Sequence, residues 1–209
     1  MAPLPPSILP KSIATSSLIA HIITNKYADG LPLYRQEEIF ARQGIEIPRN
    51  TMARWIVQTS QACVGVWNAL EERLLASPYV SCDETRTQVL KEDGKAAKSQ
   101  SWMWVRATPS DKQKIVFFDY DQSRSQKVAK KLFTDYEGYL QVDGYGAYNA
   151  LEKNKRIIRV GCNMHGRRRF FDAAEGSVKG QGLANEGLRF YKMIYDIERV
   201  ATERNRTKK

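Results

Sequence analysis

Apolar residues recur at helical spacing in the first third of the chain, over residues 12–76. This pattern predicts three helices: residues 12–26, residues 34–43 with Gly44 at the C′ position, and a long third helix capped by Asn50 or Thr51 and running to about Ala76. The inward face of the third helix is expected to carry Met52, Trp55, Ile56, Val66, Leu70 and Leu74, with Trp67 also in the core.

The middle of the chain changes to strand-like patterns. We expect strands within residues 79–90, 101–108 and 114–122, a helix over residues 123–136, and then strands at residues 139–142 and 156–164. The rest is polar and helical, weakened by glycines over residues 174–188. Three strands, a helix and two further strands predict an α/β protein, with a mixed sheet and helices outside it. In such a sheet the first and fourth strands can be neighbours.

Two of these strands lead directly into acidic residues. Asp143 follows the fourth strand, with Gly144 and Gly146 leaving room around it. Residues 79–82 form another short strand pattern, which ends on Asp83 and Glu84. An isolated Asp-Gly is more often a simple turn. Two strand-borne carboxylates lying side by side, however, suit a divalent cation such as Mg²⁺ or Mn²⁺, which prefers oxygen ligands. Asp119 and Asp121 are interpreted as solvated turn residues.

The positive charge is unevenly distributed. Of the net charge of +10, residues 151–209 carry +8, from 15 Lys and Arg against 7 Asp and Glu. Such a bias favours nucleic acid as a partner, although a solvated surface without a partner gives the same count. Arg167, Arg168 and Arg169 suit bidentate phosphate contact. They are consecutive and point in different directions, so all three cannot contact DNA together.

The second and third predicted helices resemble a helix-turn-helix, with Gly44 and a short connection between them. Arg49, Asn50, Thr51 and Arg54 would then contact DNA bases or phosphates. A plain helical hairpin explains the same pattern equally well.

Cysteine and histidine give a weaker signal. The three cysteines are widely spaced and indicate no disulfide framework. Cys162 and His165 form a lone C-x-x-H, and Cys82 is the nearest candidate for a third zinc ligand. We expect His165 to position a phosphate or a water molecule, or to be structural, rather than to bind zinc. With neither a signal peptide nor an apolar run of membrane-spanning length, we expect a cytoplasmic protein without membrane contact.

Three stretches together, VSCDETRTQVL, YLQVDGYGAYNAL and GCNMHGRRRFFDA, resemble the transposases of the bacterial insertion-sequence-sixty-six family. The resemblance implies an RNase H-like core of the DDE type, with Asp83 and Asp143 as catalytic, metal-binding acids and Cys162 and His165 as support. It also implies Mg²⁺ or Mn²⁺, transposon-end and target DNA, self-association, accessory transposition proteins and a place on the nucleoid. The family activity is cut-and-paste transposition, in which DNA is hydrolysed and the freed 3′-hydroxyl attacks target DNA.

Two departures from the family pattern shape the expected organisation. A cysteine-rich region does not precede Met1, and the motif carrying the third acid does not occur before Lys209, so the chain looks truncated at both ends. We expect a Pro-rich linker over residues 1–11, a helical DNA-binding segment over 12–76, a partial RNase H-like core over 77–175 and a basic helical extension over 176–209. The chain alone should be inactive; the alternative function is a non-catalytic DNA-binding remnant or inhibitor of transposition.

Overall fold

A computed structural model describes residues 7–109, 114–152, 155–176 and 181–206. The chain divides into two compact units, Met1–Leu70 and Glu71–Lys209. Part of the predicted linker, residues 1–6, lies outside the described residues, but Leu9 is buried in the core of the first unit. Within the described ranges, no helix is both long enough and apolar enough to cross a membrane.

The first unit is helical. Its helices are α1 (Ser16–Tyr27), α2 (Leu33–Arg42), α3 (Arg49–Ala62) and the first part of α4 (Val64–Leu75). Thr15 caps α1 by accepting a hydrogen bond from the Leu18 N–H. The helices enclose a small core that includes Ile19, Ile22, Phe40, Met52 and Trp55. The helical segment therefore has a hydrophobic centre of its own.

The connection between α2 and α3 differs from the predicted cap. Gly44 has a φ of 76°, the left-handed conformation expected after a helix. The prediction that Asn50 or Thr51 caps α3 is wrong, because the helix begins at Arg49 with Pro48 in the N-cap position. Pro48 has no side-chain cap to offer; instead the Glu37 carboxylate of α2 accepts a hydrogen bond of 3.0 Å from the Arg49 N–H.

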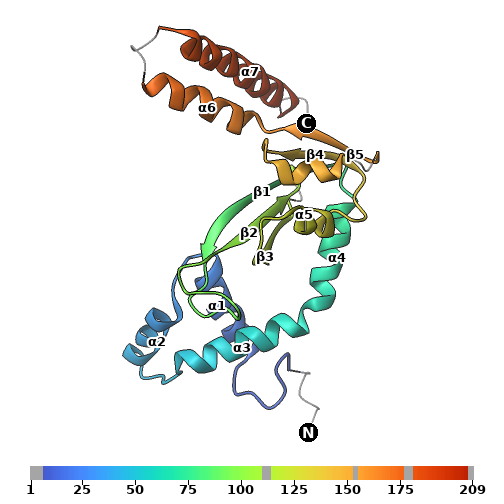
Figure 1. Ribbon diagram of the computed structural model, residues 1–209. Coiled ribbons are helices and arrows are strands. Elements are labelled where there is room, and N and C mark those ends of the chain that lie inside the picture. Colours follow the sequence, from blue (N-terminus) through green and yellow to red (C-terminus); the bar gives the residue numbers. More distant parts are fainter. Residues whose placement is uncertain (1–6, 110–113, 153–154, 177–180, 207–209) are drawn as a thin grey trace. The chain divides into compact units, whose positions relative to one another are not determined.

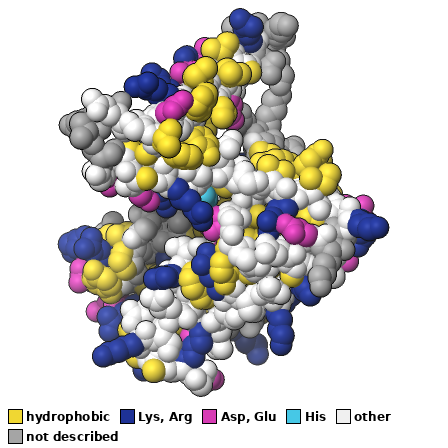
Figure 2. Space-filling view, turned by 45° about the horizontal axis from the view of Figure 1, so that its top comes forward, with side chains coloured by type: hydrophobic (Ala, Val, Ile, Leu, Met, Phe, Trp, Pro, Cys, Tyr) yellow, Lys and Arg dark blue, Asp and Glu magenta, His cyan; other side chains and the backbone are white. Residues whose placement is uncertain are grey.

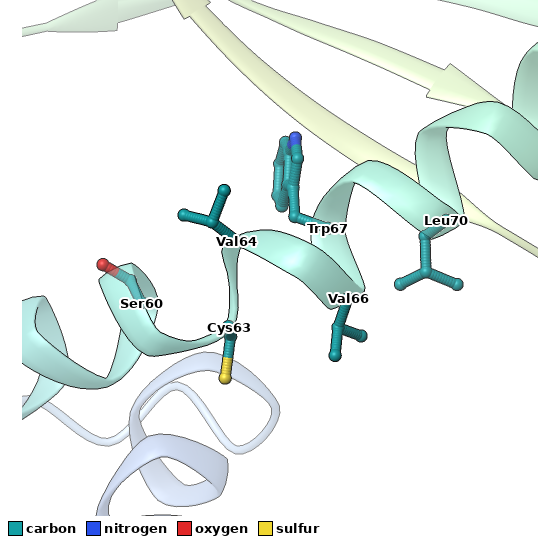
Figure 3. Close-up of a pocket in the computed structure, with 6 residues that line it drawn as sticks. All are labelled: Ser60, Cys63, Val64, Val66, Trp67 and Leu70. Atoms are coloured by element: carbon teal, nitrogen blue, oxygen red, sulfur yellow. The ribbon is translucent and has the colours of Figure 1, made fainter. Parts of the chain in front are cut away.

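The predicted long third helix is two helices. Between α3 and α4, Cys63 has φ −92° and ψ 5°, and its N–H is shared between the carbonyls of Thr59 and Ser60. This tighter turn interrupts the regular α-helical pattern. Val66, Trp67 and Leu70, which we expected in the core, are 63%, 45% and 39% exposed. An open apolar groove of about 490 Å³ lies in this region. Figure 3 shows the side chains that line it, which are Ser60, Cys63, Val64, Val66, Trp67 and Leu70.

The second unit contains a five-stranded mixed sheet (Figure 1). Its strands are β1 (Tyr79–Gln88), β2 (Gln100–Ala107), β3 (Val116–Asp121), β4 (Gly138–Val142) and β5 (Ile157–Gly161). They lie in the order β3-β2-β1-β4-β5, with β1, β2 and β3 antiparallel and β1, β4 and β5 parallel. The predicted neighbourhood of the first and fourth strands is confirmed. This order is consistent with an RNase H-like arrangement.

Short helices pack against one face of the sheet. They are the end of α4, α5 (Gln126–Leu132) and the 3-10 helix η1 (Gly146–Leu151). Because side chains alternate along a strand, Val80 and Cys82 of β1 enter this core with Leu140 and Val142 of β4. The opposite face of the sheet carries exposed residues such as Tyr139, at 48%.

A buried arginine ties β2 to its neighbours. The Arg106 side chain is fully buried and donates hydrogen bonds to both Asp119 carboxylate oxygens, at 2.7 and 3.0 Å, and to Glu71 at 2.6 Å. The interpretation of Asp119 as a solvated turn residue is therefore wrong, since it lies within β3 and neutralises this arginine. A buried charge needs such partners because its desolvation costs several kcal/mol.

The last two helices, α6 (Asn163–Glu175) and α7 (Leu183–Arg206), lie side by side (Figure 1). Two glycines allow their close approach: a Cβ atom at Gly166 would lie 2.2 Å from the Tyr191 hydroxyl oxygen, and one at Gly187 would lie 2.4 Å from the Phe170 ring. Figure 2 shows hydrophobic side chains and Lys or Arg side chains next to one another over this helical part.

Gly138 starts β4 in a conformation that other residues rarely adopt. Its φ is 139°, and a Cβ atom there would lie 2.6 Å from the Pro78 backbone oxygen. We predict that Gly138→Ala lowers the free energy of unfolding by roughly 1–3 kcal/mol, the usual cost of such strain. Gly146→Ala is the matched control, because no described atom lies within 4 Å of its Cβ position. Equal urea midpoints for the two variants would contradict this prediction.

Candidate active site

The register of β1 and β4 aligns the two predicted acids. Tyr79, Val80 and Ser81 pair with Tyr139, Leu140 and Gln141, and the same register continued to Asp83 reaches Asp143. β4 ends at Val142, so Asp143 leaves the sheet at that point. β1 continues to Gln88, so Asp83 lies within a strand and the expectation that it follows a strand end is wrong.

Both carboxylates are oriented by the backbone. Oδ1 of Asp83 accepts a hydrogen bond of 2.9 Å from the Glu84 N–H, and Oδ1 of Asp143 accepts one of 2.9 Å from the Tyr145 N–H. The Asp83 side chain is 58% exposed and the Asp143 side chain is 19% exposed. The Oδ2 atom of each acid therefore remains available for a ligand.

The beginning of α6 lies beside these acids. The N–H of Cys162, the N-cap residue, donates to the carbonyl oxygen of Val142 at 2.9 Å, which connects the helix start to the end of β4. In the first turn, His165 places Nε2 3.7 Å from Oδ2 of Asp83. Nδ1 of His165 is buried and has no hydrogen-bond partner among the described residues. The positive end of the helix dipole thus adjoins two acids.

The structure separates the three consecutive arginines. Arg168 and Arg169 line a cavity of about 410 Å³ together with Asp143 and His165. A Cβ atom at Gly144 would lie 3.9 Å from the Arg169 Nη2, an ordinary contact distance, so this guanidinium lies next to the turn that follows Asp143. Arg167 instead lines a different cavity, between α6 and α7, and its guanidinium lies over the Phe171 ring. The remaining residues of the first cavity are Gly144, Gly161, Cys162, Asn163, Gly166, Asp172 and Tyr191.

Cys82 is a poor partner for a zinc site with Cys162 and His165. Its side chain enters the hydrophobic core, whereas Asp83, the next residue, faces the other way. Burial raises the pKa of the Cys82 thiol to about 12, and its sulfur lies 3.6 Å from the Tyr148 hydroxyl oxygen. Zinc binds the thiolate form, so this cysteine is not a suitable ligand at neutral pH.

Sequence patterns alone missed a polar network beneath the acids. Glu84 points into the core, where its carboxylate accepts hydrogen bonds from the Tyr148 hydroxyl and from Nε of Arg124. Arg124 also lies 3.8 Å from Oδ2 of Asp143. The alternation of β1 does indicate that Glu84 faces away from Asp83, but nothing in the sequence pairs it with Arg124.

Asp83 and Asp143 are therefore the two candidate metal ligands. Among the described residues, no three His, Cys, Asp or Glu side chains gather closely enough to hold one ion. The oxygen donors of Asp83 and Asp143 nevertheless fit Mg²⁺ or Mn²⁺, which accept carboxylates and complete their shell with water or phosphate oxygens.

The predicted helix-turn-helix residues lie in the first unit. Arg49, Asn50 and Arg54 are exposed and Thr51 is half-buried, all in the first two turns of α3. This placement leaves them accessible on the helix that follows the turn, and their contact with DNA stays a prediction.

Comparison with known proteins agrees with the geometry. The family model described as Transposase IS66 family matches residues 11–209. The chain belongs to this family. The IS66 match covers both units and the whole candidate site, so the strand pairing that aligns Asp83 with Asp143 lies inside the family's shared region.

Three similar proteins come from Sinorhizobium fredii (strain NBRC 101917 / NGR234), and each is named only as an uncharacterized protein. The chain is 32% identical to y4qI over 180 residues, 32% identical to y4jD over 209 residues and 25% identical to y4hP over 219 residues. These matches include 80%, 95% and 94% of this chain but 33%, 40% and 39% of the relatives. The chain thus spans between a third and two fifths of their length.

Proposed function

We propose that this chain binds DNA as part of an IS66-family transposase and carries two of the acids of its DDE-type catalytic site, Asp83 and Asp143. The observation that supports this most is the β1–β4 register, which aligns the two carboxylates beside a cavity lined by Arg168 and Arg169. Paired acids next to arginines suit the metal-assisted transfer of a phosphoryl group, because the substrate is itself an anion.

Asp83 and Asp143 would hold Mg²⁺ or Mn²⁺ through their free Oδ2 atoms, because a backbone N–H already occupies each Oδ1 atom. A divalent ion bound there supplies Lewis acidity at the phosphate. Because the Oδ1 contacts already orient the two carboxylates, the side chains do not have to reorient when a ligand binds, which is the advantage of a preorganised site.

Residues of α6 bind the DNA substrate in this proposal. Arg168 and Arg169 bind DNA phosphates next to Asp143, each with a planar fork of N–H donors. His165 lies between the helix start and Asp83, where Nε2 can donate to the carboxylate or to a phosphate oxygen. The residues at the start of α3 add a second DNA contact in the first unit, through Arg49, Asn50, Thr51 and Arg54.

This proposal predicts unequal roles for the three arginines. Arg168→Ala and Arg169→Ala should each weaken binding to duplex DNA and lower the slope of log affinity against log salt by up to roughly 0.9, the value for one phosphate contact. Arg167→Ala is the matched control, since it removes the same charge from another cavity. Fluorescence anisotropy over a range of salt concentrations measures all three. Equal losses in the three variants would contradict a specific role for the Asp143 cavity.

The site is proposed to be catalytically incomplete in this chain. Two divalent ions about 4 Å apart repel each other, and their ligands must offset that repulsion. Asp83 and Asp143 suffice for one ion. Asp172 lines the same cavity as Asp143, but no three His, Cys, Asp or Glu side chains among the described residues lie close enough together to hold a metal ion. A DNA-binding chain with an incomplete site can also occupy transposon ends and thereby inhibit an intact transposase, which is the second candidate function.

We therefore predict no cleavage or joining when the purified chain is incubated in Mg²⁺ or Mn²⁺ with the end sequences of its own mobile element, while binding to that DNA is retained. Gel analysis of labelled DNA measures both. Glu198 of α7 is the acid to watch: the pKa of Tyr79 on β1 is raised mainly by burial, and the charges of Cys162 and Glu198 raise it further. Cleavage that disappears in both Asp143→Asn and Glu198→Gln would contradict the prediction and identify Glu198 as the third acid.

A further inference from the structure

Several contacts fix both the backbone and the side chain of Arg124, unlike those of an arginine that only contributes surface charge. It lies between β3 and α5, and its side chain is 28% exposed. The guanidinium lies over the Tyr145 ring, 3.7 Å from its centroid, and over the Trp102 ring at 4.8 Å. The Tyr145 hydroxyl also donates to the Arg124 carbonyl oxygen at 3.1 Å, so backbone and side chain are both fixed.

A buried carboxylate anchors this arginine. Oε1 of Glu84 accepts from Nε of Arg124 at 2.6 Å and lies 2.5 Å from Nη2, while the Tyr148 hydroxyl donates to Oε2. The Glu84 side chain is completely buried. Removing such a carboxylate from water costs several kcal/mol unless its partners are well placed. The fold therefore maintains Glu84 in one position and Arg124 with it.

The anchored guanidinium still has N–H groups that can donate hydrogen bonds to a ligand. Nη2 lies 3.8 Å from Oδ2 of Asp143, which is longer than a hydrogen bond. Nη1 donates to no residue in the ranges that the structure describes. A rigid cation with free N–H groups next to a metal-binding carboxylate suits a phosphate oxygen, since little side-chain entropy remains to be lost on binding.

We propose that Arg124 is a phosphate-binding residue of the active site, in contact with the DNA backbone beside Asp143, and that Glu84 and Tyr148 are the residues that position it. This inference rests on the proposed function. It differs from the roles of Arg168 and Arg169, because these come from α6 and Arg124 comes from the loop before α5.

The test avoids leaving a buried carboxylate without its partner. Removing Arg124 alone would leave Glu84 charged and unpaired, so the background is Glu84→Gln, whose amide still accepts from Tyr148. In this background, Arg124→Gln removes the proposed contact. Arg86→Gln is the matched control, because Arg86 also lies over the Trp102 ring, at 5.8 Å, and is exposed on β1.

Each protein is titrated with a duplex oligonucleotide in Ca²⁺ across a range of salt concentrations. We expect Arg124→Gln to lower the salt slope by roughly 0.9 relative to the Glu84→Gln background, and Arg86→Gln to leave it unchanged. Thermal unfolding of the three proteins establishes that they are folded.

Two results overturn the inference: an unchanged slope for Arg124→Gln, or an equal fall for Arg86→Gln. Failure of the proposed function looks different, because the unaltered chain would then show no salt-dependent binding to the duplex at all.

Discussion

The parallel pairing of β1 with β4 is the constraint on which the candidate site depends. A slip of one residue would turn every β4 side chain to the opposite face of the sheet and separate Asp143 from Asp83. Two features determine this register. Leu140 and Val142 must enter the core, and Gly138 allows the chain to begin β4 directly against Pro78, whose carbonyl accepts from the Tyr139 N–H. The relative position of the two acids therefore depends on the burial of Leu140 and Val142 and on the absence of a side chain at Gly138.

The same alternation assigns neighbouring residues of β1 to different tasks. Cys82 and Glu84 point into the core, while Asp83 faces the cavity side with an exposed carboxylate. Glu84 brings a negative charge into the core, and its partners Arg124 and Tyr148 neutralise and satisfy it. The sheet thus has acids on both faces at one level, one available for ligands and the other part of the support beneath them.

Sequence patterns predicted the elements of this fold well, because strand and helix periodicity is local. The order of strands, a helix and further strands was enough to expect β1 beside β4, and the Asp83–Asp143 pair follows from that. Sequence patterns failed where the position of a side chain depends on partners that are distant in the sequence. Glu84, Arg124 and Tyr148 are far apart in the chain, and no spacing rule connects them.

The errors in the helical segment have a related cause. Apolar spacing predicts a helix but does not say which neighbour covers its apolar side, so Trp67 was expected in the core and is 45% exposed. The predicted caps Asn50 and Thr51 failed because Glu37, twelve residues before the start of α3, supplies the acceptor. A local capping preference does not decide where a helix begins when a tertiary contact satisfies an N–H group of an earlier first turn.

Metal binding tests the central claim, that Asp83 and Asp143 share one divalent ion, most directly. Isothermal titration of the chain with Mn²⁺ should show one site, and both Asp83→Asn and Asp143→Asn should abolish it, because each substitution replaces one of the two charged carboxylate ligands with a neutral amide. Glu137→Gln, which alters an exposed acid that pairs with Arg156, serves as the control and should retain the site. Mn²⁺ binding that survives either aspartate substitution unchanged would contradict the claim.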